Sequence, residues 1–478
     1  MLTFNVENLF DVDGVALFDD YSMDIPEDEG IPYSANLLGK KLAFVRDTVL
    51  SVEDDEGPDV ILFQELERDR TPRSGMGDPA KFLRDFRQDS VQDMLENSGE
   101  RRIKGLPSYA FLLKALDEAG LDYPYVSIGQ SEGDLRDQAA HVNVVFSRFP
   151  ITATLAIPTL MAREVQVVTL DVDGHPFIVI NNHWKSGASN PETESIRIEN
   201  AKTVRRVLDE ILAENPKADV LIAGDLNSYY DQSLLFPEMR TTAMNSILGS
   251  QGDEQAVADG DEELYNLWFE LPQEERYSET WRDRKGTLMN MILTPGFYDD
   301  RGIQYVDNSF EVVQIPGLNM DEWGRPMRFQ FAGGGRGGSD HFPVLARFKT
   351  VDGDGSRTLA LKDPGSESDQ PGEILYVDYD LDRPGILKPL PAKTLFEMPE
   401  DQWADQIGSL FSVSAKLVSR NPVKVEAGGH VMEVYCPSKE TWLSFYRAVD
   451  GHSIRFVGEL GVWKGNYQWV IRNPSWVE

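Results

Sequence analysis

The sequence predicts an α/β fold in which two sheets pack together with helices on their outer faces, followed by a smaller β-rich unit. Short apolar, β-like runs recur along the first 349 residues, and helix-like segments lie between them. Many of these runs are separated by loops too short for a crossover helix, which favours two mixed sheets over one parallel sheet. Beyond a linker-like stretch, residues 375–478 carry β-like runs of their own.

Composition limits the class of protein. The chain has 478 residues, of which 41% are hydrophobic, as is usual for a globular protein of two or three domains. The net charge of −34 argues against broad nonspecific binding to DNA or anionic membranes, although bound cations can invert the field of an acidic site. No apolar run approaches membrane-spanning length, and the single Cys436 cannot form an internal disulfide. Because no signal peptide is visible, we expect a soluble, cytoplasmic protein; a trimmed leader would instead place it outside the cell.

The predicted elements of the first domain follow in order. Apolar runs mark the strands at residues 1–6, 59–64, 142–147, 165–172, 176–184, 219–227, 287–294 and 342–348. Helical spacing predicts helices over 39–55 and 192–215, and the second has an acidic first turn. Residues 66–105 and 240–275 are polar and irregular, so we expect them to be insertions.

A domain boundary is predicted after residue 349, which gives a first domain over 1–349. Residues 350–374 are rich in Gly, Asp, Ser and Pro, which is typical of a linker. The remainder, 375–478, has a helix-like segment at 438–449 between strand-like runs at 410–419, 430–436, 453–465 and 466–474. Short strands around one helix resemble an OB fold, so we expect a small β-barrel-like domain there.

Polar side chains stand where the predicted strands meet loops. They are Asn5 and Glu7, Gln64 and Glu65, His183, Asp225 and Asn227, and Asp340 and His341. Since the ends of neighbouring strands meet at one edge of a sheet, these groups can converge there. Each pair alone also fits an ordinary turn; Asp225 with Asn227, for example, is a favourable Asx-turn sequence.

Together these side chains supply carboxylates, amides and two histidines, but no thiolate. Such an oxygen-rich set suits Mg²⁺, Mn²⁺ or Ca²⁺ rather than structural zinc. Hard divalent cations and histidines are the groups that hydrolysis of a phosphate ester requires. The residues themselves therefore indicate a metal-dependent hydrolytic site.

Five segments carry a resemblance to a known family. They read TFNVENLF (3–10), DVILFQELE (59–67), VINNHWKSG (179–187), LIAGDLNS (221–228) and GGSDHFPV (337–344). In this order they resemble the endonuclease/exonuclease/phosphatase family over residues 1–349, and NVENLF and NHWKS are most like its bacterial nuclease-type members. The resemblance implies a four-layer α/β sandwich with the active site on one edge and a metal-dependent phosphodiesterase activity.

The resemblance also implies a metal site. Glu65 would be the main ligand, and the side chains near the metal would be those of Asn5, Glu7 and Asp340. The expected cofactor is Mg²⁺ or Mn²⁺, with Ca²⁺ as a structural or supporting ion. A metal there would polarise a phosphoryl oxygen.

Four residues would have catalytic roles by the same resemblance. Asp225, held by Asn227, would orient or deprotonate the attacking water. His183 and His341 would contact the scissile phosphate, stabilising developing charge or protonating the leaving oxygen. The glycines before Ser339 would let the backbone pass close to the bound phosphate.

One position departs from the family pattern. Members usually carry an aspartate in the segment that here reads GTLMNMILT, where it bonds the histidine of the Ser-Asp-His motif. Asn290 stands there, so we expect it to orient His341 through a neutral hydrogen bond that stabilises the imidazolium less. Asp299 or Asp300 could reach His341 instead.

Cationic and aromatic residues bear on the substrate. The cations expected to contact phosphate are Lys185, Arg282, Arg284 and Arg336, and guanidinium groups suit phosphate oxygens. Arg325 and Arg328 also stand near the predicted site. In the C-terminal domain, one cluster could stack nucleobases or could belong to the core: Trp463, Lys464, Tyr467 and Trp469.

We therefore expect a metal-dependent phosphodiesterase, and most specifically a nuclease that hydrolyses DNA. A phospholipid or inositol-phosphate hydrolase of the same family is an alternative, although neither an exposed apolar loop nor a dedicated basic pocket is evident. A non-catalytic nucleic-acid-binding protein is a second alternative; the full set of acids argues against it, and only Asn290 supports it. Nucleic acid, with DNA favoured, is the expected partner, without a membrane or an obligate protein partner.

Overall fold

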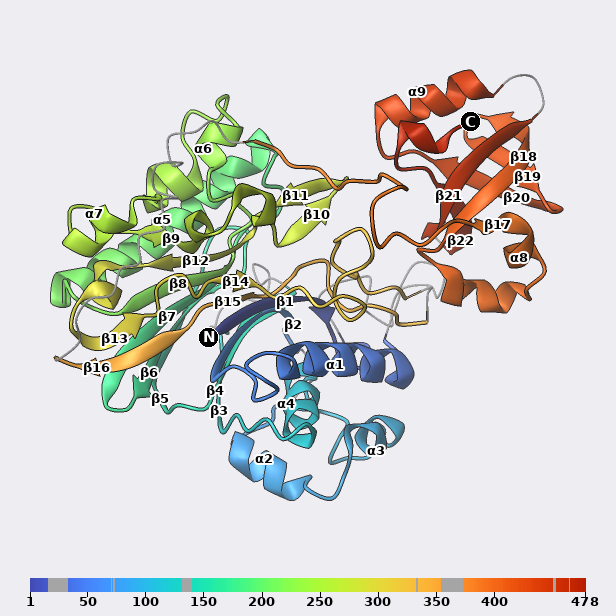
Figure 1. Ribbon diagram of the computed structural model, residues 1–478. Coiled ribbons are helices and arrows are strands. Elements are labelled where there is room, and N and C mark those ends of the chain that lie inside the picture. The colour runs from blue at the N-terminus through green and yellow to red at the C-terminus, as the bar shows by residue number, and fades with distance from the viewer. Residues whose placement is uncertain are drawn as a thin grey trace.

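The computed structural model describes residues 1–15, 33–69, 71, 74–130, 140–331, 334–353, 373–449, 453–463 and 465–478. The predicted α/β class and the two packed sheets are confirmed (Figure 1). Most of the predicted linker, 350–374, lies outside the described residues, as does Lys464. Within the described ranges, no helix combines the length and the apolar character needed to cross a membrane.

The first sheet has six strands and contains the N-terminus. Its order is β14 (Glu311–Val312), β15 (Val344–Leu345), β1 (Leu2–Leu9), β2 (Val60–Glu67), β4 (His141–Ser147) and β3 (Tyr125–Ile128). The parallel strands β1 and β2 are buried almost throughout, as expected for strands covered on both faces. Their register shifts between Asn5 and Leu9, so the regular strand is interrupted where the polar residues begin.

The second sheet also has six strands. Its order is β5 (Ile151–Ile157), β6 (Val165–Val172), β7 (His175–His183), β8 (Val220–Asp225), β12 (Met289–Leu293) and β9 (Tyr265–Asn266). The central strands β7 and β8 are parallel and pair His183 with Asp225. Strands β1 and β2 contact β8, and β4 contacts β7, so the two sheets pack face to face.

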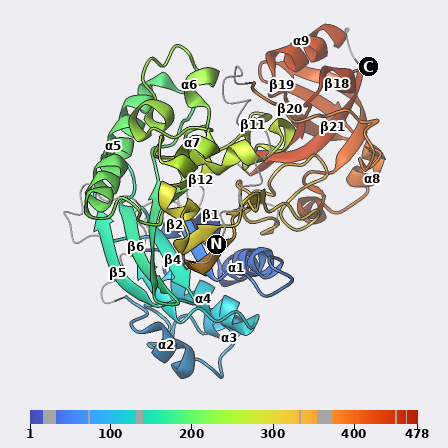
Figure 2. The same cartoon turned by 60° about the vertical axis from the view of Figure 1, so that its left-hand side comes forward.

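Helices cover the outer face of each sheet, which completes the predicted four layers (Figures 1 and 2). Those beside the first sheet are α1 (Ala35–Leu50), α2 (Pro79–Asp85), α3 (Val91–Glu96) and α4 (Ser108–Glu118). Those beside the second are α5 (Pro191–Glu214), α6 (Gln232–Leu235) and α7 (Glu254–Asp259). We call these layers, together with the loops and the short hairpin attached to them, the sandwich.

Several element boundaries differ from the prediction. Helix α1 begins before residue 39 because Ser34 caps it, accepting a hydrogen bond from the N–H of Leu37. The expected insertion 66–105 contains α2 and α3, which are too short for helical periodicity to be recognised.

The run 342–348, predicted as one strand, is divided between β15 and β16 (Phe348–Asp352). β15 belongs to the first sheet, whereas β16 pairs with β13 (Arg301–Tyr305). A two-stranded hairpin, β10 (Glu279–Trp281) and β11 (Arg284–Gly286), pairs separately from the two large sheets.

The C-terminal region forms a closed five-stranded β-barrel, as predicted. Its order is β18 (Leu410–Arg420), β19 (Val423–Ala427), β20 (His430–Tyr435), β22 (Asn466–Val470) and β21 (Ile454–Trp463), and β21 pairs back with β18. Helix α9 (Lys439–Ala448) connects β20 to β21, and β17 (Leu390–Pro391) and α8 (Ala392–Phe396) precede the barrel. One helix within a five-stranded barrel fits the expected OB-like arrangement. We call β17 to β22 with these two helices the barrel.

Part of the sandwich chain belongs to the hydrophobic core of the barrel. The Trp323 side chain is 1% exposed and is part of the barrel's buried cluster. Its ring centroid lies 5.1 Å from that of Tyr379 and 5.7 Å from that of Trp476. The division of the chain at residue 349 stays a prediction. Because Trp323 packs into the barrel's core, that core includes a residue from before the predicted boundary.

Candidate active site

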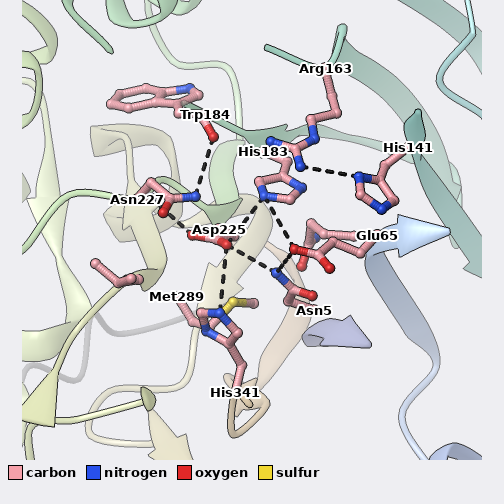
Figure 3. Close-up of polar contacts among 12 residues, drawn as sticks. Asn5, Glu65, His141, Arg163, His183, Trp184, Asp225, Asn227, Met289 and His341 are labelled. Carbon is pink, nitrogen blue, oxygen red and sulfur yellow. Dashed lines mark hydrogen bonds and ion pairs between the residues drawn. The ribbon is translucent and has the colours of Figure 1, made fainter. Parts of the chain in front are cut away.

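Three side chains converge near the carboxyl ends of β2, β7 and β8. Possible ligand atoms of Glu65, His183 and Asp225 all lie within 4.8 Å of one another. His183 Nε2 is 3.7 Å from Oε1 of Glu65 and 3.4 Å from Oδ2 of Asp225 (Figure 3). Asn5 of β1 donates hydrogen bonds from Nδ2 to the same two carboxylate oxygens, at 3.1 and 3.0 Å. Both sheets therefore contribute to one cluster, at the shared edge.

The Ser-Asp-His segment reaches this cluster because β15 runs antiparallel to β1 and pairs Val344 with Thr3, so the residues that precede β15 continue toward the carboxyl end of β1. Ser339 Oγ donates to the carbonyl of Asn5 at 2.6 Å and accepts from the N–H of His341 at 3.0 Å. His341 Nε2 lies 3.9 Å from Oδ2 of Asp225 and 3.7 Å from Oδ1 of Asp340. Ser339 thus fixes the approach of His341 to the cluster.

The glycines before Ser339 are explained by packing against the protein itself. A side chain at Gly338 would clash with the ring of Phe44 in α1, and one at Gly337, whose φ is +74°, would clash with the carbonyl of Met327. Buried Lys41 of α1 donates to the carbonyl of Gly338. These close approaches require glycine irrespective of any bound phosphate.

The backbone at the site is strained at several non-glycine residues. Those with φ in the left-handed region are Glu7, Asn8, Glu65 and Asn227. Glu65 has φ of +64° and lies where the pairing of β2 with β4 shifts register between Phe63 and Leu66. Strained conformations of this kind cluster at functional sites, because they aim side chains where a regular strand would not.

The GDLN segment forms the expected Asx turn. The backbone N–H of Asn227 donates to Oδ1 of Asp225 at 2.9 Å, and Asn227 Nδ2 donates to the carbonyl of Trp184 at 3.2 Å. Gly224, with φ of +121°, lies so close to the carbonyl of Asn182 that no side chain fits there. The turn leaves Oδ2 of Asp225 directed toward the two histidines.

Glu65 is ionised although the protein encloses most of its side chain. Burial opposes its ionisation, but nearby His141, His183 and Arg163 outweigh that effect and hold the pKa of Glu65 well below its usual range. Burial raises the pKa of Asp225, although His341 lowers it in part. The two carboxylates of the cluster therefore differ in basicity, and Asp225 is the better proton acceptor.

The two histidines of the cluster have opposite proton affinities. Burial holds the pKa of His183 well below its ordinary value, so this imidazole is neutral at neutral pH. Burial acts on His341 in the same direction, but Asp340, Asp225 and Glu279 outweigh it and raise its pKa. His341 therefore holds a proton more readily than His183 does.

Two further residues at the site were missed by sequence reasoning. Arg163 Nη2 donates to Nδ1 of His141 at 3.1 Å, so the other nitrogen, Nε2, donates to Oδ1 of Asn8 at 2.8 Å. Burial lowers the pKa of His141 to about 4, which agrees with this neutral tautomer. His141 is the first residue of β4, so the strand-end pattern could have identified it; Arg163 lies in a loop and carries no comparable signal.

The prediction for Asn290 is wrong. Its Nδ2 donates to the carbonyl oxygens of Ser228, Thr287 and Leu288 at 3.2, 3.0 and 3.0 Å. Its Oδ1 accepts from Nδ2 of Asn266 at 3.0 Å. The reason is register: Met289 pairs with Asp225, so the next side chain, that of Asn290, points to the opposite face of β12.

Glu279 is a carboxylate that acts on His341 as the family's aspartate would, because it helps to raise the pKa of His341. The backbones of the two residues form an isolated antiparallel β-bridge. Burial raises the pKa of Glu279 to about 8, with a contribution from Asp340. The alternative residue Asp299 instead accepts from the N–H of Arg301 in the turn before β13. Asp300 pairs with the guanidinium of the same Arg301.

Glu7 does not face the cluster. Its carboxylate accepts hydrogen bonds from Nε of Arg328 and, at 3.0 Å, from the N–H of Phe329. Burial raises the pKa of Glu7 to about 7, and Asp340 contributes. Glu7 thus connects β1 to residues 328–329 and does not join Glu65 as a ligand.

The predicted substrate cations divide into two groups. Arg282 and Arg336 line the same cavity as Asp340 and His341. The Arg284 guanidinium lies over the ring of Phe236, at 5.7 Å from its centroid, outside that cavity. Among the contacts of the described residues, none joins the Lys185 side chain to the cluster; only its backbone is bonded, to Asn200 and Arg197.

The cluster fits a hard divalent cation. Two carboxylates and one imidazole offer oxygen and nitrogen ligands suited to Mn²⁺ or Mg²⁺, and the strongly acidic Glu65 stays ionised as a ligand must. The Asn5 amide presents Nδ2 to the two carboxylates and its Oδ1 accepts from the N–H of Glu7, so Asn5 positions the ligands and is not itself one. A second group of carboxylates, those of Asp11, Asp13 and Asp69, has oxygens within 4.8 Å of one another beyond the ends of β1 and β2.

Comparison with known proteins supports the resemblance seen in the sequence. Residues 138–350 match the model of the Endonuclease/Exonuclease/phosphatase family, whose members are phosphoester hydrolases. A search among curated proteins finds no match.

Three solved structures from different organisms are among those to which the chain is similar. Truncated TDP2 of Caenorhabditis elegans is 15% identical with a TM-score of 0.37, covering 66% of this chain and 92% of its own. A family protein of Leptotrichia buccalis is 14% identical with a TM-score of 0.40, and the mannosyl-6-phosphatase Bt3783 of Bacteroides thetaiotaomicron is 14% identical with a TM-score of 0.37. Each of these two covers 73% of this chain and 98% of its own.

Proposed function

We propose that this chain, which belongs to the endonuclease/exonuclease/phosphatase family over residues 138–350, is a metal-dependent phosphodiesterase that hydrolyses nucleic acid, with DNA as the favoured substrate. The observation that carries the proposal is the convergence of Glu65, Asp225, His183 and His341 on one edge of the sandwich. Two acids and two histidines in different protonation states are the groups that phosphodiester hydrolysis needs.

Glu65 would hold the metal, with His183 and Asp225 near it. When bound, a divalent cation would supply positive charge that polarises a phosphoryl oxygen. Asn5 bonds both carboxylates and so keeps them at a fixed separation. Asp340 and Asp225 both have a carboxylate oxygen within 4 Å of Nε2 of His341, so Asp340 would support the charge on that imidazole.

Asp225 would accept the proton of the attacking water. Its raised pKa makes it a better base than Glu65, and the Asn227 N–H fixes its orientation. As the water oxygen bonds to phosphorus, the bond from phosphorus to the leaving oxygen breaks. Cationic His341 would donate its proton to that oxygen, or would stabilise the charge developing on the phosphate.

A substrate panel tests the proposal. Purified protein is incubated with plasmid DNA, single-stranded DNA, RNA, bis(p-nitrophenyl) phosphate and a phospholipid, each with Mg²⁺, Mn²⁺, Ca²⁺ or EDTA. We expect cleavage of DNA and of the small phosphodiester with Mg²⁺ or Mn²⁺, and none with EDTA. Hydrolysis of the phospholipid alone would contradict nucleic acid as the substrate. Full activity in EDTA would contradict the proposed dependence on a metal.

A further inference from the structure

A large cavity lies between the sandwich and the barrel and opens onto the proposed active site. Its volume is about 800 Å³. The sandwich contributes Glu279, Trp281, Asp340 and His341 to its lining, and the barrel contributes Tyr435 and Trp463. We call the space bounded by these six residues the interdomain groove. The β10–β11 hairpin, which carries Glu279 and Trp281, lies on the side of the sandwich nearest the barrel in Figure 1.

The walls of the interdomain groove are fixed by polar contacts between the two units. Arg336 of the glycine-rich segment donates from Nη1 to the carbonyl of Ile407 at 2.9 Å. Asp283 of the β10–β11 turn accepts from the hydroxyl of Tyr379 at 2.7 Å and from Nη1 of Arg472 at 3.1 Å. With Trp323 buried in the barrel core as well, the groove is a preformed feature and not a gap between loosely joined units.

Aromatic rings on both walls are exposed in a way that the fold does not require. Trp281 is 59% exposed, Trp463 is 65% exposed and Tyr435 is 48% exposed. The other aromatics singled out in the sequence are structural: Trp469 is buried, and the Tyr467 ring packs edge-on against Trp403 at 5.3 Å. Exposed tryptophans beside a catalytic centre offer flat faces on which a planar ring can stack.

The charge of the interdomain groove is nearly balanced. Exposed Arg282 and Lys388 line it, and within the part of the chain that the structure describes neither forms an ion pair. Arg325, Arg328 and Arg472 also line it, but they are paired with the carboxylates of Glu459 and Glu7. Proteins that bind duplex DNA present strongly positive surfaces, because the phosphates of both strands must be neutralised. The groove has no such surface, so stacking must supply much of the affinity of any nucleic acid that enters it.

We propose that the interdomain groove holds a single-stranded segment of nucleic acid, with bases stacked on Trp281 and Trp463 and the next phosphate delivered to His341. This inference rests on the proposed function and names the form of its substrate. Bases of a single strand expose their faces, whereas those of a duplex are already stacked on one another. The barrel thereby completes the substrate site of the sandwich.

The test measures binding without turnover. The affinity of the full-length protein for a short fluorescent oligothymidylate is determined by anisotropy in EDTA. We expect Trp281→Ala and Trp463→Ala each to weaken binding about tenfold, which corresponds to about 1.4 kcal/mol and to the loss of one base–aromatic stack. Trp281→Phe and Trp463→Phe should retain most of the affinity, because a ring face remains.

Trp442→Ala is the matched control. Trp442 is 39% exposed on α9, stacks on Tyr446 at 4.9 Å and lies outside the interdomain groove, so its loss should leave the affinity unchanged. Thermal unfolding of each variant, compared with the wild type, separates loss of binding from loss of fold. A Trp281→Ala/Trp463→Ala double variant that folds and still binds the oligonucleotide as tightly as the wild type would overturn the inference, as would tighter binding of a duplex of the same length.

The two proposals fail separately. If the wild type hydrolyses bis(p-nitrophenyl) phosphate but the tryptophan variants bind the oligonucleotide normally, the groove inference fails and the proposed function stands. If the tryptophan variants lose binding while the wild type hydrolyses no phosphodiester, the groove inference stands as a binding site and the proposed function fails.

Discussion

Arg325 of the sandwich and Glu459 of the barrel form an ion pair, with 3.3 Å between Nη1 and Oε2. Arg472 bonds the same carboxylate, with 3.0 Å between its Nη2 and Oε1. Burial raises the pKa of Glu459, but the two guanidinium groups outweigh it and lower the pKa from 4.5 to about 2. The contact between the two units therefore depends on an ionised carboxylate with two cationic partners.

Glu459→Gln should lower the free energy of unfolding at neutral pH. A carboxyl group whose pKa falls by this much on folding contributes about 3 kcal/mol. That contribution is fully present above about pH 4.5 and is lost as the pH falls toward 2, so the wild type should lose stability over this range and the variant should lose less. Denaturant unfolding at a series of pH values measures both effects.

Glu478→Gln is the control for this substitution, because it breaks an ion pair with Arg455 whose side chains are 72% and 65% exposed. Exposed pairs contribute roughly 0–1 kcal/mol, so little change is expected. Equal losses in the two variants would contradict the assignment to Glu459.

Asp340→Asn should move the alkaline limb of the kcat/KM profile to lower pH. Although burial lowers the pKa of His341, Asp340 is the largest influence that raises it. Removing that charge lowers the pKa, so His341 loses its proton, and the enzyme its acid, at a lower pH. The pH–rate profile is recorded beside that of Asp173→Asn, a change in the exposed turn between β6 and β7. An unmoved alkaline limb in Asp340→Asn would mean that a different group titrates there.

Glu65→Gln should reduce kcat/KM by about a thousandfold or more while leaving the fold intact, because a metal supplies several kcal/mol of transition-state stabilisation. Isothermal titration with Mn²⁺ should show weaker binding in the same variant. Glu426→Gln, on an exposed position of β19, is the matched control and should behave as the wild type. Near-normal turnover of Glu65→Gln at saturating Mg²⁺ would rule out Glu65 as the ligand.

Asn290→Asp should destabilise the protein without altering the pH profile. The amide donates to three carbonyl oxygens, and an aspartate there would place a carboxyl group against them in a fully buried position. The cost should be about 3 kcal/mol or more. Asn97→Asp, at the exposed end of α3, should cost far less. A stable Asn290→Asp variant with a raised alkaline limb would restore the original interpretation of this residue.

The convergence of Glu65, His183 and Asp225 could be predicted because it follows from strand direction. β7 and β8 are parallel, so residues that end each strand meet at one edge. His141 obeys the same logic at the opposite end of a strand, since antiparallel β4 begins where β2 ends. Its omission came from placing the start of that strand one residue too late.

The direction of Glu7 could not be predicted from the pattern. In a regular strand, Asn5 and Glu7 would share a face, and both would point into the site. In the structure, Glu7 has a φ of +48°, and the register between β1 and β2 shifts at this point. The Glu7 carboxylate therefore leaves the shared face and bonds Arg328 instead. Arg328 lies 321 residues further along the chain, so no local pattern records this contact.

The position of Trp323 has a consequence for how such enzymes diversify. A domain with a hydrophobic core of its own can be exchanged between genes, because recombination within the linker sequence leaves no apolar surface uncovered. Here the barrel core is completed by an indole that is encoded upstream of the predicted linker. Recombination at the linker would pair the barrel with a foreign loop and leave a hole of tryptophan size, at a cost of about 3–5 kcal/mol. The loop around Trp323 and the barrel should therefore have been inherited together, as one unit of gene shuffling.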